Sequence, residues 1–128
     1  MPFYESAKGK LGKILFWGAT QAEADAAELR CADITERERG KLPSLFMPFL
    51  KNGEMPKSKE KFKKIEKQDG LFAFKSFQIR LLGTYLDRLT FGICHCVRKK
   101  RDKYSDADLK KAQAKKEAMK KEWEREHP

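Results

Sequence analysis

The densest run of residues able to act on a charged ligand is basic and spans residues 98–103 (Arg-Lys-Lys-Arg-Asp-Lys). Residues 51–104 carry fifteen basic and six acidic side chains, which is a net charge of +9 out of +10 for the whole chain. Positive charge concentrated in one part of a domain attracts polyanions, of which nucleic acid is the most common. The alternative is a surface of lysines that only keeps the protein in solution.

Two cysteines flank a histidine at Cys94, His95 and Cys96, a pattern that could bind zinc or form a Cys–His nucleophile pair. Alternate side chains of a regular strand point to opposite faces, which would separate both sulfurs from the imidazole. A tetrahedral zinc site needs further ligands, and Cys31 and His127 have no recognisable spacing. We therefore expect no metal site and two buried free thiols. Three cysteines, an odd number, also fit reduced thiols better than a disulfide framework.

The phenylalanines of the same region also have two interpretations. Phe72, Phe74, Phe77 and Phe91 could stack nucleobases on an open sheet, as aromatic residues do in single-strand binders. Phenylalanines at alternating strand positions are more typical of a hydrophobic core, and we expect these to be core residues.

Hydrophobic periodicity predicts the elements that would position these residues. An apolar run at residues 14–17 predicts a strand, and the alanine- and glutamate-rich residues 21–31 predict a helix. A second helix is predicted by an apolar stripe at helical spacing, formed by Leu42, Leu45, Phe46, Phe49 and Leu50. Pro48 should kink or end that helix nearby because proline has no amide hydrogen.

From residue 62 the periodicity changes to about two, which predicts four strands at residues 62–65, 71–75, 77–86 and 89–98. Connections this short force neighbouring strands to run antiparallel. Ser105 is a good N-cap for a last helix, whose apolar stripe should rest on the domain.

These elements predict a single α+β domain over residues 1–128. It would consist of a strand and N-terminal helices (about 13–50) packed on one face of an antiparallel β-meander of about four strands (about 62–98), followed by a C-terminal helix (about 105–126). No run approaches the roughly 18 apolar residues needed to cross a bilayer, and the N-terminus lacks the pattern of a secretion signal. We therefore expect a cytoplasmic protein with no membrane partner.

The order of these elements and several short motifs resemble those of RelE/HigB-type toxins of the RelE/ParE superfamily. Residues 70–75 (GLFAFK), preceded by Lys64-Ile65 and followed by residues 78–82 (QIRLL), resemble the family pattern KKL…GLYELR…YRVLY. Residues 93–103 (ICHCVRKKRDK) resemble the family's LLHGFVKKTQK. The similarity covers roughly residues 42–120, and small phage-derived relatives share the same pattern.

Some positions of the family pattern hold in this chain and others change. Those that hold are Arg80, His95, Lys99, Lys100 and Lys103. Among those that change, Lys75 replaces an arginine, Gln78 replaces a tyrosine, Cys96-Val97 replace Gly-Phe, and Tyr104-Ser105 replace Thr-Pro.

The resemblance implies cleavage of mRNA in the decoding site of the ribosome, neutralised by a cognate antitoxin protein. In this chemistry a ribose 2′-hydroxyl attacks the adjacent phosphate, and fixed cations balance the charge without a metal or another cofactor. Arg80 is the first candidate for stabilising the transition state, because a guanidinium can hold two phosphate oxygens. The flanking RNA backbone would be bound by Lys75, Arg98, Lys99, Lys100, Arg101 and Lys103.

Proton transfer has three candidates on this interpretation. His95 titrates in the right range and occupies the family's histidine position, although a single histidine in an apolar strand is often a hydrogen-bonded core residue. Tyr104 could donate a proton to the leaving oxygen if neighbouring cations lower its pKa, or it could be a hydrophobic brace. A lysine of residues 99–103 with a depressed pKa is the third.

Two other classes of function share the expected scaffold. A non-enzymatic inhibitor of DNA gyrase, like the ParE branch of the superfamily, would need neither His95 nor a phosphate site around Arg80. A plain nucleic-acid or partner-binding module would be harmless when expressed. The basic run and Arg80 favour the nuclease.

Overall fold

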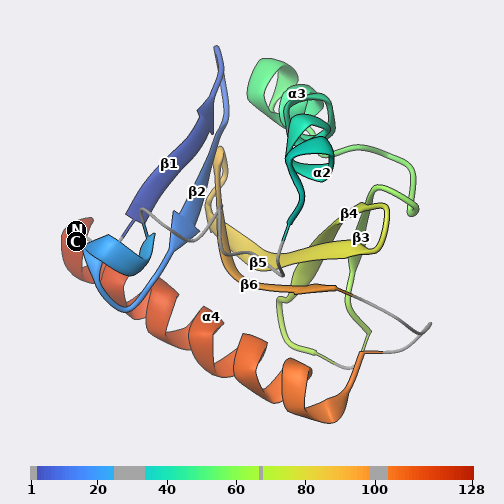
Figure 1. Ribbon diagram of the computed structural model, residues 1–128. Helices are drawn as coiled ribbons and strands as arrows, with labels where there is room; N and C mark the ends of the chain where they lie inside the picture. The colour runs from blue at the N-terminus through green and yellow to red at the C-terminus, as the bar shows by residue number, and fades with distance from the viewer. Residues whose placement is uncertain (1–2, 25–33, 67, 99–103) are drawn as a thin grey trace.

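The computed structural model describes residues 3–24, 34–66, 68–98 and 104–128, and its centre is a mixed six-stranded sheet (Figure 1). The strands are β1 (Phe3–Lys8), β2 (Lys13–Trp17), β3 (Phe62–Lys64), β4 (Phe72–Ser76), β5 (Ile79–Asp87) and β6 (Thr90–Arg98), and they lie in the order β1-β2-β6-β5-β4-β3. Strands β3 to β6 pair antiparallel in sequence order, which confirms the expected meander.

The N-terminal part differs from the expectation of one strand followed by helices. Strands β1 and β2 form an antiparallel hairpin, and β2 then pairs with β6 in parallel, so the meander is extended to a mixed sheet. The parallel pair was not visible in the sequence because its partners are far apart in the chain, and only nearby turns leave a local signal. The helix expected at residues 21–31 is present at residues 21–24, and its remainder lies outside the described residues.

Helices cover both faces of the sheet, which corrects the expectation that they pack on one face (Figure 1). The short α2 (Glu36–Gly40) and α3 (Leu42–Asn52) lie over one face, and α4 (Asp106–Glu126) crosses the other. Each face has its own core, the larger one around Phe46 and Phe74 and the smaller one around Leu82 and Ala112. Successive side chains of β4 to β6 point to opposite faces of the sheet. Many of them are apolar, so both faces of these strands are buried.

Helix α3 continues past Pro48 and ends at Gly53, whose φ of 73° is left-handed. The predicted apolar stripe is buried in full, and Phe49 and Leu50 follow the proline on that stripe. Burial of these two side chains outweighs the one hydrogen bond that the proline removes, and the helix continues for four residues beyond Pro48.

A bulge interrupts the β5–β6 pair, since Leu82 faces His95 but Gly83 faces Ile93. A Cβ on Gly83 would lie 1.9 Å from the carbonyl oxygen of Gly92, so the two strands approach closely at this point. One extra residue on β6 shifts the alternation of side chains by one position.

Helix α4 begins as predicted, because the Ser105 hydroxyl accepts from the amide of Asp108. It buries Ala112, Lys116 and Met119 against the sheet. No helix in the described part of the chain combines the length and apolar character needed to cross a membrane.

Candidate nucleic-acid interface

Three cations from three neighbouring strands share the sheet face that α4 covers, at the end of the sheet beside the start of that helix. Arg80 of β5 pairs with Lys75 of β4, and Lys63 of β3 pairs with Ala73, two positions before Lys75. Ala73 belongs to the core beneath α4, so the alternation of strand side chains places all three cations on that face. We call Lys63, Lys75 and Arg80 the cationic face.

The charges of the cationic face act on one another. The pKa of Lys75 is lowered, first by burial and then by the positive charges of Arg80 and Lys63, while Glu60 opposes the shift. The Lys75 ammonium donates to the carbonyl oxygen of Lys59 at 3.0 Å. Like charges held together destabilise a fold, and such clusters are typical of sites that bind an anion.

Arg80 is held in a fixed orientation. Its Nη1 donates to the carbonyl oxygens of Phe77 (2.7 Å) and Ile79 (3.0 Å), and its guanidinium is hydrogen-bonded to the Tyr104 hydroxyl. Its Nε is buried without a partner among the described residues. A buried donor left without a partner is uncommon in proteins.

Tyr104 lies against the smaller core and next to Arg80. Burial raises the pKa of its hydroxyl, and the charge and hydrogen bond of Arg80 only partly oppose this effect. The condition under which Tyr104 was expected to become a stronger acid, a pKa lowered by cations, is therefore not met. The hydroxyl stays protonated at neutral pH and remains a hydrogen-bond donor.

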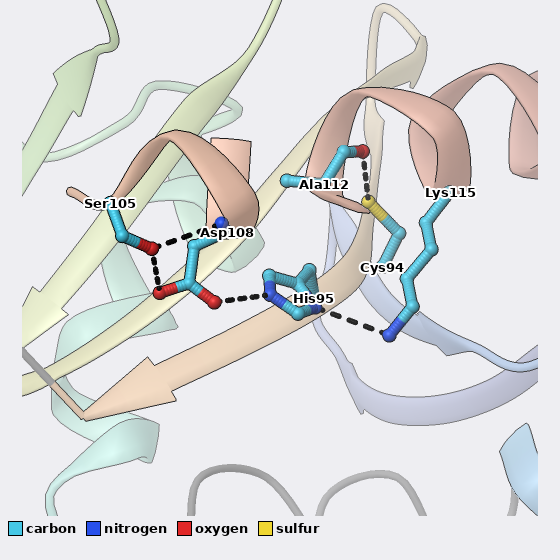
Figure 2. Close-up of polar contacts among 6 residues, drawn as sticks. All are labelled: Cys94, His95, Ser105, Asp108, Ala112 and Lys115. Carbon is cyan, nitrogen blue, oxygen red and sulfur yellow. Dashed lines mark hydrogen bonds and ion pairs between the residues drawn. The ribbon is translucent and has the colours of Figure 1, made fainter. Parts of the chain in front are cut away.

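His95 is held between two residues of α4 (Figure 2). Its Nδ1 lies 3.1 Å from Lys115 Nζ, and its Nε2 lies 3.5 Å from Asp108 Oδ1. An ammonium can only donate, so Nδ1 accepts and the ring proton is on Nε2, facing the carboxylate. Burial and then the Lys115 charge lower the pKa of His95, against the opposing effect of Asp108. The imidazole is neutral at pH 7, and its side chain is 10% exposed.

Ser105, Asp108 and His95 form a chain of hydrogen bonds, but in an order that does not activate the serine (Figure 2). The Ser105 hydroxyl donates to Asp108 Oδ2 at 2.9 Å, so the carboxylate lies between hydroxyl and imidazole. A serine nucleophile needs the imidazole as its neighbour, because the imidazole takes its proton. The network instead fixes the first turn of α4 on β6.

Arg98 lies on the opposite face from Arg80. Its guanidinium binds the Glu38 carboxylate of α2 with two hydrogen bonds, at 2.7 and 3.0 Å. The structure thus brings together Arg80, Lys75 and Tyr104 of the predicted site, and separates Arg98 from them. The remaining predicted site residues, Lys99, Lys100, Arg101 and Lys103, lie outside the described residues.

The bulge in β6 overturns the expected geometry of Cys94, His95 and Cys96. Cys94 and His95 both face α4, while Cys96 packs on the core of the other face. Cys94 is a buried free thiol that donates weakly to the carbonyl oxygens of Leu82 and Ala112, and burial raises its pKa to about 12 (Figure 2). Cys96 is disulfide-bonded, which corrects the expectation of two free thiols. No group of three metal-ligand side chains occurs within the described ranges.

Two residues of this region were not predicted as site residues. Lys63 could have been found from the strand pairing, since it lies one strand away from Lys75 on the same face. Phe77 was assigned to the core with Phe72, Phe74 and Phe91, but it is exposed at the β4–β5 turn. Its place after the strand, where the chain must turn, was the available signal.

Comparison of the chain with known protein families, curated proteins and solved structures finds no match.

Proposed function

We propose that this protein is a toxin of the RelE/HigB type, a metal-independent endoribonuclease that cleaves mRNA on the ribosome in the cytoplasm. The observation that carries the proposal is the cationic face, in which Lys63, Lys75 and an oriented Arg80 meet beside the Tyr104 hydroxyl. Cations held together against their mutual repulsion support a site for an anion, and the phosphodiester backbone is the anion such toxins act on.

The cleavage assigned to this site is transfer of a phosphoryl group within the RNA strand. The ribose 2′-oxygen forms a bond to the adjacent phosphorus, and the bond from phosphorus to the 5′-oxygen breaks. Arg80 stabilises the extra charge on the phosphate oxygens. Lys75, whose lowered pKa raises its neutral fraction, takes the 2′-proton. Tyr104 gives a proton to the leaving oxygen.

His95 has a positioning role in this proposal. Both of its ring nitrogens face groups of α4, so it supports the start of the helix that follows Tyr104. An antitoxin with an acidic segment would cover the cationic face and block the site and its charge together.

The test is cleavage of an mRNA on programmed ribosomes by the purified protein and its Arg80→Ala and Lys75→Met variants. The matched control is Arg88→Ala, which removes a cation from the β5–β6 turn at the opposite end of β5. Cuts should appear with the wild type and the control and fall by at least ~100-fold in Arg80→Ala, the scale of losing one transition-state donor. Intact mRNA with competent ribosomes would refute the nuclease.

A second candidate is a protein of the same scaffold that binds without cutting, as an inhibitor of DNA gyrase or a nucleic-acid or partner-binding module. Both ring nitrogens of His95 face groups of α4, and the pKa of Tyr104 is raised. These observations favour the second candidate, because they make both residues less suited to transferring a proton. A gyrase supercoiling assay separates the two, since inhibition that survives Arg80→Ala supports the non-catalytic protein.

A further inference from the structure

Phe77 is exposed at a place where no packing requires an aromatic residue. The residue is 58% exposed, more than any other large hydrophobic residue of the described ranges. Phe74 and Phe91 are fully buried, so Phe77 differs from the phenylalanines with which the sequence grouped it. A single exposed apolar side chain is common on protein surfaces, so the meaning of Phe77 depends on its backbone and on the charges around it.

The backbone of Phe77 is strained as well. Ser76 pairs with Ile79, so Phe77 and Gln78 form a two-residue hairpin loop. Phe77 has a φ of 54°, and it is the only non-glycine residue with positive φ in the described part of the chain. A positive φ at the first loop position alone follows the pattern of a type II′ turn, where glycine is usual. A bulky residue there lowers stability, so neither the core nor the turn explains phenylalanine.

The surroundings of Phe77 are cationic. Its carbonyl oxygen accepts from Arg80 Nη1 at 2.7 Å, which couples the turn directly to the cationic face. On the other side, Phe77 lines a hollow of about 390 Å³ together with Gln78, Arg37, Glu38 and Arg98. The negative charge of Glu38 in that hollow is balanced by Arg98, which donates two hydrogen bonds to its carboxylate. Arg37 is exposed and adds a further positive charge.

We propose that Phe77 stacks on an unpaired nucleobase of RNA next to the phosphate held by Arg80. An exposed aromatic ring between cations matches a nucleotide, whose base presents a flat apolar surface and whose phosphate is negative. A protein segment that buried Phe77 would need apolar surface beside the ring, and the neighbouring side chains are charged or polar. The proposal rests on the RNA binding assigned above and adds to it a contact with the base.

The experiment is fluorescence anisotropy with a short single-stranded RNA in which every ribose is 2′-O-methylated, so that it cannot be cleaved. Phe77→Ala should weaken binding roughly 10-fold, within the range known for one stacked base, while Phe77→Tyr should bind like the wild type. Met47→Ala, which removes a comparably exposed hydrophobic side chain from α3, is the matched control and should leave binding unchanged.

The Phe77→Gly variant distinguishes a loss of affinity caused by lost stacking from one caused by lost folding stability. It should lose the same affinity as Phe77→Ala while its unfolding midpoint rises above that of the wild type, because glycine relieves the positive φ. Equal affinity of Phe77→Ala and the wild type, or no binding of this RNA by the wild type, would overturn the stacking contact. Since the methylated RNA reports binding alone, failure of cleavage on ribosomes with stacking intact would remove the nuclease and leave this inference in place.

Discussion

The ion pair between Glu38 and Arg98 predicts a specific loss of stability in acid. Two hydrogen bonds from Arg98 and one from the Thr35 amide hold the pKa of Glu38 at about 2, compared with 4.5 when unperturbed. The folded protein therefore holds this carboxyl ionised more strongly than the unfolded chain does. The resulting stability is fully present above pH 4.5 and is lost as the pH falls toward about 2.

The magnitude follows from the shift of the pKa. At about 1.4 kcal/mol per pKa unit, the shift of Glu38 would correspond to about 3 kcal/mol at neutral pH. The Arg98 side chain is 31% exposed, and solvent weakens such pairs, so we reduce this value to about 2 kcal/mol. Between pH 5 and pH 3 the linkage relation removes more than half of it, about 1 kcal/mol.

The assay is urea unfolding of the wild type and Glu38→Gln at pH 7, 5 and 3. Glutamine keeps the size of the side chain and removes its charge, so the free energy of unfolding of the variant lacks this contribution. The difference between the two proteins should be about 2 kcal/mol at pH 7 and shrink by about 1 kcal/mol between pH 5 and pH 3. Glu36→Gln, an exposed change in the same helical turn, is the control and should follow the wild type at each pH.

A difference between wild type and Glu38→Gln that stays constant from pH 7 to pH 3 would refute this reasoning. The pair would then contribute through packing or shape, and its charge would have no net effect on folding.

Two further predictions concern the β5–β6 pair and its contacts with α4. Gly83→Ala should destabilise the protein by about 3 kcal/mol in urea unfolding, because the new methyl group would meet a backbone oxygen at 1.9 Å. Gly40→Ala, which enters open space, should cost nothing, and similar losses in both variants would contradict the argument. By NMR titration, Asp108→Asn should lower the pKa of His95 and Lys115→Met should raise it, since the two charges act in opposite directions. An unchanged pKa in both variants would show that burial alone sets it.

The meander and the last helix could be predicted because their signals are local. Strands β3 to β6 begin and end within about two residues of the expected positions, since short turns and alternating apolar residues define them. The N-cap of α4 at Ser105 could also be predicted from the sequence. Strand β1 was not predicted because its sequence, Phe-Tyr-Glu-Ser-Ala-Lys, is mostly polar. It forms a strand by pairing with β2.

The candidate site could be predicted only in part. Both Arg80 and Lys75 were predicted as site residues, and their pairing across β4 and β5 could have been derived from the tight turn that joins the two strands. The contact between Arg80 and Tyr104 depends on where the chain returns after β6, which no spacing encodes. The bulge placed Cys94 and His95 on one face because two glycines, Gly83 and Gly92, let the strands approach, and a regular alternation could not reveal this.

The parallel pairing of β2 with β6 determines when the sheet can form while the protein is being synthesised. Ile14 lies beside Phe91, 77 positions later in the chain. Closing such a long loop is entropically unfavourable, and contacts of this kind form late and slowly. During synthesis the N-terminal hairpin must wait until β6 has been made before it can dock, and α4, which covers the same sheet, is made after β6. A protein proposed to cut messages on ribosomes would therefore complete the sheet that carries its proposed site only after its own message has been read past the codons of β6.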